Sequence, residues 1–305
     1  MFARFPERAW WRAWWLACRP KTLAAAFAPV ALGSACATAQ TGEFHTVPAA
    51  LALLFALLTQ ITCNFANDHG DFARGADTAA RVGPTRAVAS GAVSPSAMRC
   101  AVGLCATAAF GAGMFLVAWG GWWLVPVGAV CLLACLAYTG GPFPLAYNGL
   151  GDVFVVLFFG FTAVLFTAYT QCGLFPSAAW AAGLVCGLLA ANILVVNNAR
   201  DMATDARAGK RTTVVLFGRG FARIEYVANL CVALAAPVVL CSFGGFGAWV
   251  LLPLATLPLA VALGRAFWRV REPVAHNPLL GKTAAFLLAH SLLFAAGLVL
   301  GAGTG

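Results

Sequence analysis

The chain has 305 residues, of which 62% are hydrophobic and only 10% are charged. This composition excludes an ordinary soluble domain, which needs more polar surface, and indicates a membrane protein with many spans. In a membrane protein, the formal net charge of +9 is explained by basic loops that set the orientation in the membrane and by binding of an anionic ligand. We therefore expect no nucleic-acid partner.

Four tryptophans, Trp10, Trp11, Trp14 and Trp15, lie among basic residues before the first long apolar stretch. Tryptophan and arginine together favour the boundary between lipid and water. We therefore expect an interfacial amphipathic segment that leads into a retained first span, rather than a cleaved signal peptide.

Nine apolar stretches then follow, each about as long as the roughly 20 residues that a transmembrane helix needs. Long apolar runs indicate helices, because the strands of a membrane β-barrel are short and alternate in polarity. We expect an all-α polytopic membrane protein of about nine transmembrane helices, with residues 1–305 forming a single transmembrane domain. The nine predicted spans are 22–40, 47–67, 97–119, 122–139 (the shortest, interrupted by Pro126), 150–170, 178–198, 225–243, 247–265 and 283–301.

The 19 Lys and Arg residues fall into four groups, within residues 4–21, 74–99, 200–223 and 265–282. With nine spans and a cytoplasmic N-terminus, all four groups lie on the cytoplasmic side, and the opposite connections carry none. This is the positive-inside pattern. We expect a multi-pass protein of the plasma (inner) membrane whose N-terminus and active-site loops are cytoplasmic and whose C-terminus lies on the opposite side.

The second span ends in a cluster of amide and carboxylate side chains. On a helix, Asn64, Asp68 and Asp71 share one face, and Asn67 and Asp71 are one turn apart. A long polar loop rich in Gly and Pro follows, from Asp68 to about Arg99, and is expected to fold back over a site.

The sixth span ends in a similar cluster, in which Asn197, Asp201 and Asp205 form one helical stripe at i, i+4 and i+8. A second long loop is expected from Arg200 to Arg223. With Asp77, the two clusters hold five of the ten carboxylates of the chain. Carboxylates at a membrane edge are costly, so this concentration indicates a function.

Two oxygen-rich stripes suit a hard cation such as Mg²⁺, which proteins hold with a few carboxylates and substrate phosphates. With Lys and Arg around it, such a metal would bind a diphosphate and neutralise the charge of the leaving group. The apolar interior, with 23 Phe, would hold an isoprenoid tail and stabilise an allylic cation. The residues therefore indicate chemistry on a polyprenyl diphosphate at the cytoplasmic face of the membrane.

The two clusters resemble the paired N-x3-D-x3-D motifs of the UbiA superfamily of intramembrane aromatic prenyltransferases. Asn197, Asp201 and Asp205 match the second motif completely. The first motif departs, because Gly75 stands where the family has Asp and Asp77 follows two residues late. With this departure, the first motif resembles that of the subfamily that prenylates 1,4-dihydroxy-2-naphthoate in menaquinone synthesis. The stretches that carry the same resemblance are residues 19–22, 67–77, 81–91, 138–142 and 197–201.

The resemblance implies nine helices around a central cavity open to the cytosol and laterally to lipid, with Mg²⁺ between the motifs. By position, the catalytic residues that bind metal and diphosphate would be Asn67, Asp68, Asp71, Asp201 and Asp205. Asp77 is a further metal candidate. The predicted substrate-binding residues are Lys21, Arg86, Lys210, Arg81, Arg200, Asn197, Tyr138 and Tyr147.

The implied reaction ionises a polyprenyl diphosphate to an allyl cation, which the ring carbon bearing the carboxylate attacks. Loss of CO₂ then gives demethylmenaquinol. Two alternatives remain open: a sister prenyltransferase acting on 4-hydroxybenzoate or another aromatic acceptor, and a cation-coupled transporter of an anionic metabolite. No residue stands out as a general base, and Asp152 and Glu225 are expected to be helix-start residues favoured by the dipole.

Overall fold

A computed structural model describes residues 7–77 and 81–303, and Arg4 of the first basic group lies outside these ranges. All regular structure within them is helical. The helices are α1 (Glu7–Ala17), α2 (Ala24–Thr41), α3 (Thr46–Ala73), α4 (Pro95–Gly120), α5 (Leu124–Ala137), α6 (Gly151–Val155), α7 (Ala163–Cys172), α8 (Ser177–Arg207), α9 (Thr213–Phe243), α10 (Leu257–Arg269) and α11 (His276–Gly301). The π-helical segment η3 (Val156–Thr162) joins α6 to α7, and the 3₁₀ segment η4 (Ala248–Thr256) precedes α10; shorter 3₁₀ turns are η1 (Pro20–Thr22), η2 (Leu145–Tyr147) and η5 (Pro273–Ala275).

Each of the nine predicted spans falls on a helical segment, which confirms the all-α membrane architecture. In the described residues, seven segments are long and apolar enough to cross a bilayer. The bent pair Trp10–Thr22 and Ala24–Thr41, which meet at 43°, would be the eighth. The ninth, α5, has only 14 residues. The protein is therefore a multi-pass membrane protein, with one span shorter than expected.

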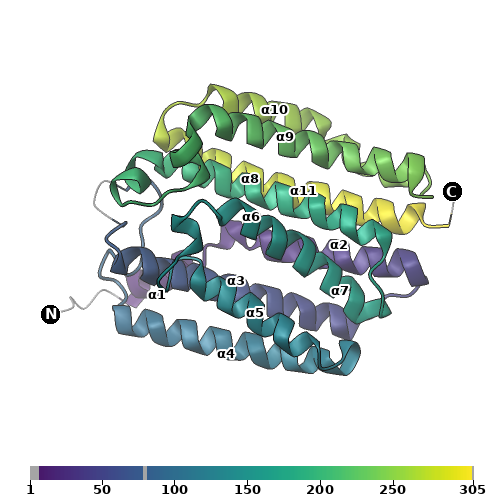
Figure 1. The fold of residues 1–305 in the computed structure, drawn as a ribbon, viewed down its shortest axis with the longest axis horizontal. Coiled ribbons are helices and arrows are strands. Elements are labelled where there is room, and N and C mark those ends of the chain that lie inside the picture. Colours follow the sequence, from purple (N-terminus) through teal and green to yellow (C-terminus); the bar gives the residue numbers. More distant parts are fainter. Residues whose placement is uncertain (1–6, 78–80, 304–305) are drawn as a thin grey trace.

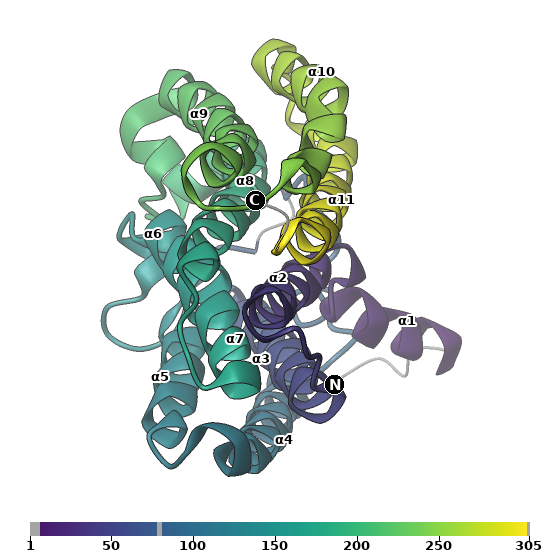
Figure 2. The ribbon, with the colours of Figure 1, turned by 90° about the vertical axis from the view of Figure 1, so that its right-hand side faces the viewer.

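The long helices run side by side in alternating directions (Figure 1), and seen end-on they form a bundle with α2 near its middle (Figure 2). Five connections meet at one end of this bundle. Arg74 Nη2 donates to Gly141 O at 2.6 Å, Arg211 N to Tyr147 O at 3.2 Å, and Arg219 Nη1 to Arg271 O at 3.1 Å. We call this end, formed by residues 18–23, 74–77, 81–94, 138–150, 208–212 and 270–275, the basic end.

The prediction of a long loop from Arg200 to Arg223 is wrong. No Gly or Pro interrupts the chain between Arg200 and Arg207, so α8 continues to Arg207 and the connection to α9 is only residues 208–212. Gly218, with φ of 81°, then breaks α9. Glu225 consequently lies inside α9, and its predicted place at a helix start is also wrong.

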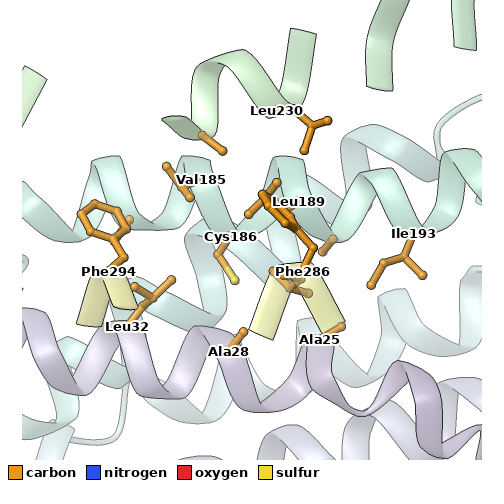
Figure 3. Packing of buried hydrophobic residues seen from close by; sticks show 14 of the residues in the cluster. Ala25, Ala28, Leu32, Val185, Cys186, Leu189, Ile193, Leu230, Phe286 and Phe294 are labelled. Carbon is orange, nitrogen blue, oxygen red and sulfur yellow. The ribbon is translucent and has the colours of Figure 1, made fainter. Parts of the chain in front are cut away.

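The main hydrophobic core lies where α2, α8, α9 and α11 meet (Figure 3). Beside this core, small residues let η3 approach α8 closely, since a methyl group added at Gly160 of η3 would come within 2.8 Å of Gly187 Cα on α8. Such close approach through small residues is the usual way in which membrane helices gain packing contacts. It seats η3 and α7 firmly against α8.

A cavity of about 300 Å³ lies beside this core. Its walls come from α2, α3, α4, α5, α8 and the segment from α6 to α7, while α11 contributes only Leu280. The central cavity implied by the family resemblance is thus present, and it is built mainly by the N-terminal helices.

Candidate active site

Asp71, in the last turn of α3, is the centre of the polar part of the cavity. Its side chain is buried, with 3% of the residue exposed. Tyr147 Oη donates to its Oδ1 at 3.0 Å, and Arg86 Nη2 donates to its Oδ2 at 3.2 Å. Lys210 Nζ lies 3.7 Å from Oδ1. Three predicted site residues from three different loops therefore converge on one predicted carboxylate.

Asp68 lies one turn earlier on α3 and makes different contacts. Its two carboxylate oxygens accept hydrogen bonds from the backbone N–H groups of Ala87 and Val88, both at 3.0 Å, and the residue is 1% exposed. Asp68 thus ties the loop between α3 and α4 to the helix. Because Arg86 immediately precedes Ala87, this bond also fixes the position of the guanidinium that contacts Asp71.

Arg81 joins the two acidic clusters. Its Nη1 lies 2.5 Å from Asp77 Oδ1 and its Nη2 lies 3.8 Å from Asp201 Oδ2, so it spans from the loop after α3 to α8. Arg86 Nε lies 3.5 Å from the other oxygen of Asp77. Because Arg81 contacts both Asp77 and Asp201, the clusters face each other at the same end of the bundle.

Burial raises the pKa of Asp77 to about 6, against the opposing effect of Arg81.

At the end of α8, Asp201 is held by an arginine from its own helix. Arg200 donates to both oxygens of Asp201, at 2.8 and 2.7 Å, and to Asn197 Oδ1 at 2.7 Å. Its Nη1 reaches Asn277 on α11 at 3.0 Å. Asp205 differs, because its Oδ2 is buried and has no hydrogen-bond partner among the described residues.

Lys210, in the short loop after α8, lies between the clusters and lines the cavity. Burial alone would lower its pKa, but Asp71, Asp205 and Asp201 raise it above its usual value. Its Nζ also lies 5.3 Å from the centre of the Tyr147 ring. Burial and the adjacent Asp71 raise the pKa of Tyr147, so the tyrosine stays protonated and acts as a hydrogen-bond donor.

The structure brings most, but not all, of the predicted site residues to the cavity wall. Asn67, Asp71, Arg86, Tyr138, Asn197 and Lys210 line it. The other predicted residues do not line it. Arg81, Arg200, Asp77, Asp201 and Tyr147 contact lining residues or one another. Asp68 binds the backbone of Ala87 and Val88, and Asp205 lies near Lys210. Lys21 is exposed and lies outside the cavity wall.

Two charged residues of the cavity wall were not among the predicted site residues. Arg19 lines the cavity with a left-handed backbone (φ of 50°) and a buried Nη2 without a partner in the described part of the chain. Asp152 is the second residue of α6, as its helix-start prediction requires, but it also lines the cavity. The Arg-Pro-Lys-Thr run signalled a basic site near Arg19, whereas no spacing in the sequence signalled Asp152.

The remainder of the cavity wall is mostly apolar, with Phe55, Leu116, Val127, Phe158 and Phe166 among its residues. Because α3 rises about 1.5 Å per residue, Phe55 lies about 24 Å along the helix axis from Asp71. The cavity therefore joins a charged mouth at the basic end to a long apolar interior. This shape suits a ligand with an anionic head and a hydrocarbon tail.

In the described residues, no group of three or more His, Cys, Asp or Glu side chains is arranged to hold a metal ion. The carboxylates are instead paired with arginine and lysine. Their chemistry nevertheless fits Mg²⁺, which prefers oxygen ligands. The partnerless buried oxygen of Asp205, one helical turn from Asp201 and near Lys210, is available for such an ion.

Comparison with known proteins agrees with this geometry. Residues 26–289 match the UbiA prenyltransferase family. The chain is 36% identical over 295 residues to 1,4-dihydroxy-2-naphthoate octaprenyltransferase of Escherichia coli (strain K12), covering 95% of this chain and 96% of the relative. The enzyme of the same name from Mycobacterium tuberculosis is 36% identical over 292 residues, covering 94% of this chain and 97% of the relative.

Solved structures show the same fold at lower sequence identity. A UbiA homolog from Aeropyrum pernix K1 is 15% identical with a TM-score of 0.68, covering 90% of this chain and 97% of that one. A UbiA homolog from Archaeoglobus fulgidus, bound to DMAPP and Mg²⁺, is 14% identical with a TM-score of 0.59, covering 94% of this chain and 99% of that one. The chain therefore belongs to the UbiA prenyltransferase family, and its activity is that of an aromatic prenyltransferase.

Proposed function

We propose that this protein transfers a polyprenyl group from a polyprenyl diphosphate to 1,4-dihydroxy-2-naphthoate, with loss of diphosphate and CO₂, to give demethylmenaquinol. The observation that carries this proposal is the near full-length relatedness to enzymes named for that reaction, at 36% identity. The cavity supports it, because a charged mouth and an apolar interior suit a prenyl diphosphate.

We further propose that Mg²⁺ binds between the ends of α3 and α8, held by Asn67, Asp71, Asp201 and Asp205. The bound metal would neutralise charge on the departing diphosphate. The orphaned oxygen of Asp205 supports this assignment, as does the Mg²⁺ named with the Archaeoglobus homolog. Asp77 stays a predicted further ligand. Asp68 would act on the site through the loop that it holds, since backbone N–H groups occupy both of its oxygens.

The cations around Asp71 would bind the diphosphate. Arg86 and Lys210 line the cavity and contact Asp71, so both guanidinium and ammonium groups can turn to phosphate oxygens without leaving the mouth. Arg81, which joins the two clusters, would hold them together while the charge of the substrate enters. The aromatic wall would exclude water from the allylic cation and stabilise it.

The lipid bilayer is the proposed environment of the substrate tail as well as of the protein. The protein would lie in the plasma (inner) membrane with its basic end facing the cytoplasm, because basic loops are retained on that side. The C-terminus would then lie on the opposite side. Fusing a reporter enzyme to the C-terminus tests this orientation, and cytoplasmic reporter activity would contradict it.

Purified protein in detergent provides the direct test of the activity. With polyprenyl diphosphate, 1,4-dihydroxy-2-naphthoate and Mg²⁺, we expect a prenylated, decarboxylated product, and excess chelator should abolish it until Mg²⁺ is restored. An equal supply of 4-hydroxybenzoate in the same reaction ranks the two acceptors. Preference for 4-hydroxybenzoate would replace the proposed acceptor, and absence of any turnover outside sealed vesicles would favour a transporter.

A further inference from the structure

Two carboxylates line the cavity in the described part of the chain, Asp71 and Asp152. Asp71 is surrounded by Arg86, Lys210 and Tyr147. Asp152 has no ion-pair partner within 4 Å among the described residues, so the two differ in the charge that compensates them. Binding of the diphosphate and its metal therefore does not explain why a second carboxylate, Asp152, lines the cavity.

The contacts of Asp152 leave one oxygen free inside the protein. The residue is 7% exposed, and its Oδ2 accepts a hydrogen bond from Thr213 Oγ1 at 2.7 Å. Its Oδ1 is buried and has no hydrogen-bond partner among residues 7–77 and 81–303. A buried acceptor without a donor destabilises the folded protein, and does so more when it is charged. Retaining this oxygen in a membrane protein points to a ligand that supplies the donor.

The surroundings of Asp152 suit an aromatic ligand with hydroxyl groups. A methyl group added at Gly151 would come within 3.0 Å of Tyr138 Oη and 3.3 Å of Leu194 Cδ2, so both groups lie beside the start of α6. Tyr138 and Leu194 also line the cavity. A carboxylate oxygen and a phenol hydroxyl thus border an apolar surface on which a flat ring can lie.

We propose that Asp152 is a catalytic carboxylate that binds a ring hydroxyl of the aromatic acceptor through Oδ1 and takes its proton during prenyl transfer. This inference rests on the proposed function and adds the acceptor subsite to it. Tyr138 lies beside Asp152 and would bind the second oxygen of the acceptor.

The step conserves atoms and charge without another reactant. The electron pair of the ring carbon bearing the carboxylate forms the bond to the prenyl carbon, and the bond from that carbon to diphosphate breaks, with diphosphate taking the electron pair. The neighbouring hydroxyl becomes a ketone as its proton moves to Asp152. The bond to the carboxylate then breaks, CO₂ leaves, its electron pair restores the ring, and the ketone oxygen takes the proton back.

Asp152→Asn tests this assignment, because the amide oxygen can still accept from Thr213 but the side chain cannot take a proton. In detergent, we expect transfer to 1,4-dihydroxy-2-naphthoate to fall by about 10²–10⁴-fold, the usual contribution of a general base. Binding of polyprenyl diphosphate with Mg²⁺ and the thermal melting temperature should match those of the unchanged protein.

Glu225→Gln is the matched control. Glu225 on α9 also has a buried carboxylate oxygen without a partner among the described residues, but it does not line the cavity. The charge of Glu225 is close enough to act on Asp152, so we expect its transfer rate to change by much less than that of Asp152→Asn. Thr213→Val separates structure from chemistry, since it removes the hydrogen bond to Asp152 and leaves the carboxylate in place; its loss of transfer should be much smaller than that of Asp152→Asn.

Ring-substituted acceptors make the test independent of how much protein folds. An electron-withdrawing substituent that ionises the hydroxyl at the assay pH removes the need for a base. The ratio of rates with this acceptor and with the parent acceptor cancels the concentration of folded enzyme. We expect this ratio to rise at least about tenfold in Asp152→Asn relative to the unchanged protein.

The outcomes separate the two proposals. If the unchanged protein transfers prenyl groups and Asp152→Asn retains its rate, or has an unchanged acceptor ratio, the assignment of Asp152 is wrong and the proposed function stands. If diphosphate binding falls as far as transfer in Asp152→Asn, Asp152 is structural. If the unchanged protein transfers to no hydroxylated aromatic acid, both proposals fail together.

Discussion

The ends of α3 and α8 carry similar acidic stripes, but they are stabilised in different ways. At the end of α3, the groups that bind Asp71 and Asp68 come from the loop before α4, from Tyr147 and from Lys210. At the end of α8, Asp201 is bound by Arg200, its neighbour on the same helix. One half of the site is assembled from distant segments, and the other is nearly complete within one helix.

This difference separates catalytic from positioning roles. A carboxylate whose partners are cavity-facing cations, such as Asp71, can exchange them for metal and diphosphate. Asp68, bound by backbone N–H groups, has partners that cannot leave without unfolding the loop. Substitutions that loosen the loops should therefore impair the site at the end of α3. At the end of α8, the site should be impaired mainly when a carboxylate is removed.

The largest effect is expected when either half loses a metal-binding charge. Asp71→Asn and Asp201→Asn should each reduce turnover by about 10²–10³-fold, as expected when a preorganised electrostatic group is removed from a reacting centre. Turnover in detergent at saturating Mg²⁺ measures this loss, with the melting temperature as the folding control. Near-normal activity in either variant would contradict the metal assignment and make the two ends unequal.

A smaller effect should distinguish cations inside the cavity from those outside it. Arg86→Ala should raise the KM for polyprenyl diphosphate by about tenfold or more, the equivalent of one charged hydrogen bond of 1.5–3 kcal/mol. The KM for the acceptor should change less. Lys21→Ala is the matched control, because Lys21 is exposed and outside the cavity. An equal rise in both variants would place Lys21 at the diphosphate after all.

The smallest effect on turnover should come from the loop anchor. Asp68→Asn leaves one acceptor oxygen for the N–H groups of Ala87 and Val88, so the loop loses a charged hydrogen bond worth about 1.5–3 kcal/mol. We expect a lower melting temperature and a higher KM for polyprenyl diphosphate, with the concentration of Mg²⁺ for half-maximal activity unchanged. If the Mg²⁺ requirement rose instead, Asp68 would be a ligand and the contrast with Asp71 would disappear.

Hydrophobicity and helical spacing were sufficient to predict the spans and the acidic stripes. Asn197, Asp201 and Asp205 are one turn apart in any helix, so their common face follows from the sequence. The end of α8 was placed too early because polar residues after Arg200 were interpreted as a loop. The side chains of Asp201, Thr204 and Arg207 instead find partners on α8 itself. Arg200 binds Asn277 on α11, which lies far along the chain.

The partners of each carboxylate were less accessible to prediction. The bonds from Ala87 and Val88 to Asp68 use backbone groups, which leave no signature in residue type. Asp152 and Arg19 lie in the cavity because of the direction of a short helix and of a left-handed residue. Such directions depend on the packing of the whole bundle and are not encoded in local spacing.

The short helix α5 has a consequence for the surrounding lipid. Its 14 residues span about 21 Å, against about 30 Å of hydrocarbon in a typical bilayer. Trp122 and Trp123 precede it and Tyr138 follows it, and such residues settle at the headgroup level. The mismatch favours a thinner bilayer along this wall of the cavity, at fractions of a kcal/mol per Å. In reconstituted membranes, lipids with shorter acyl chains should therefore match α5 at a lower free-energy cost than lipids with longer acyl chains.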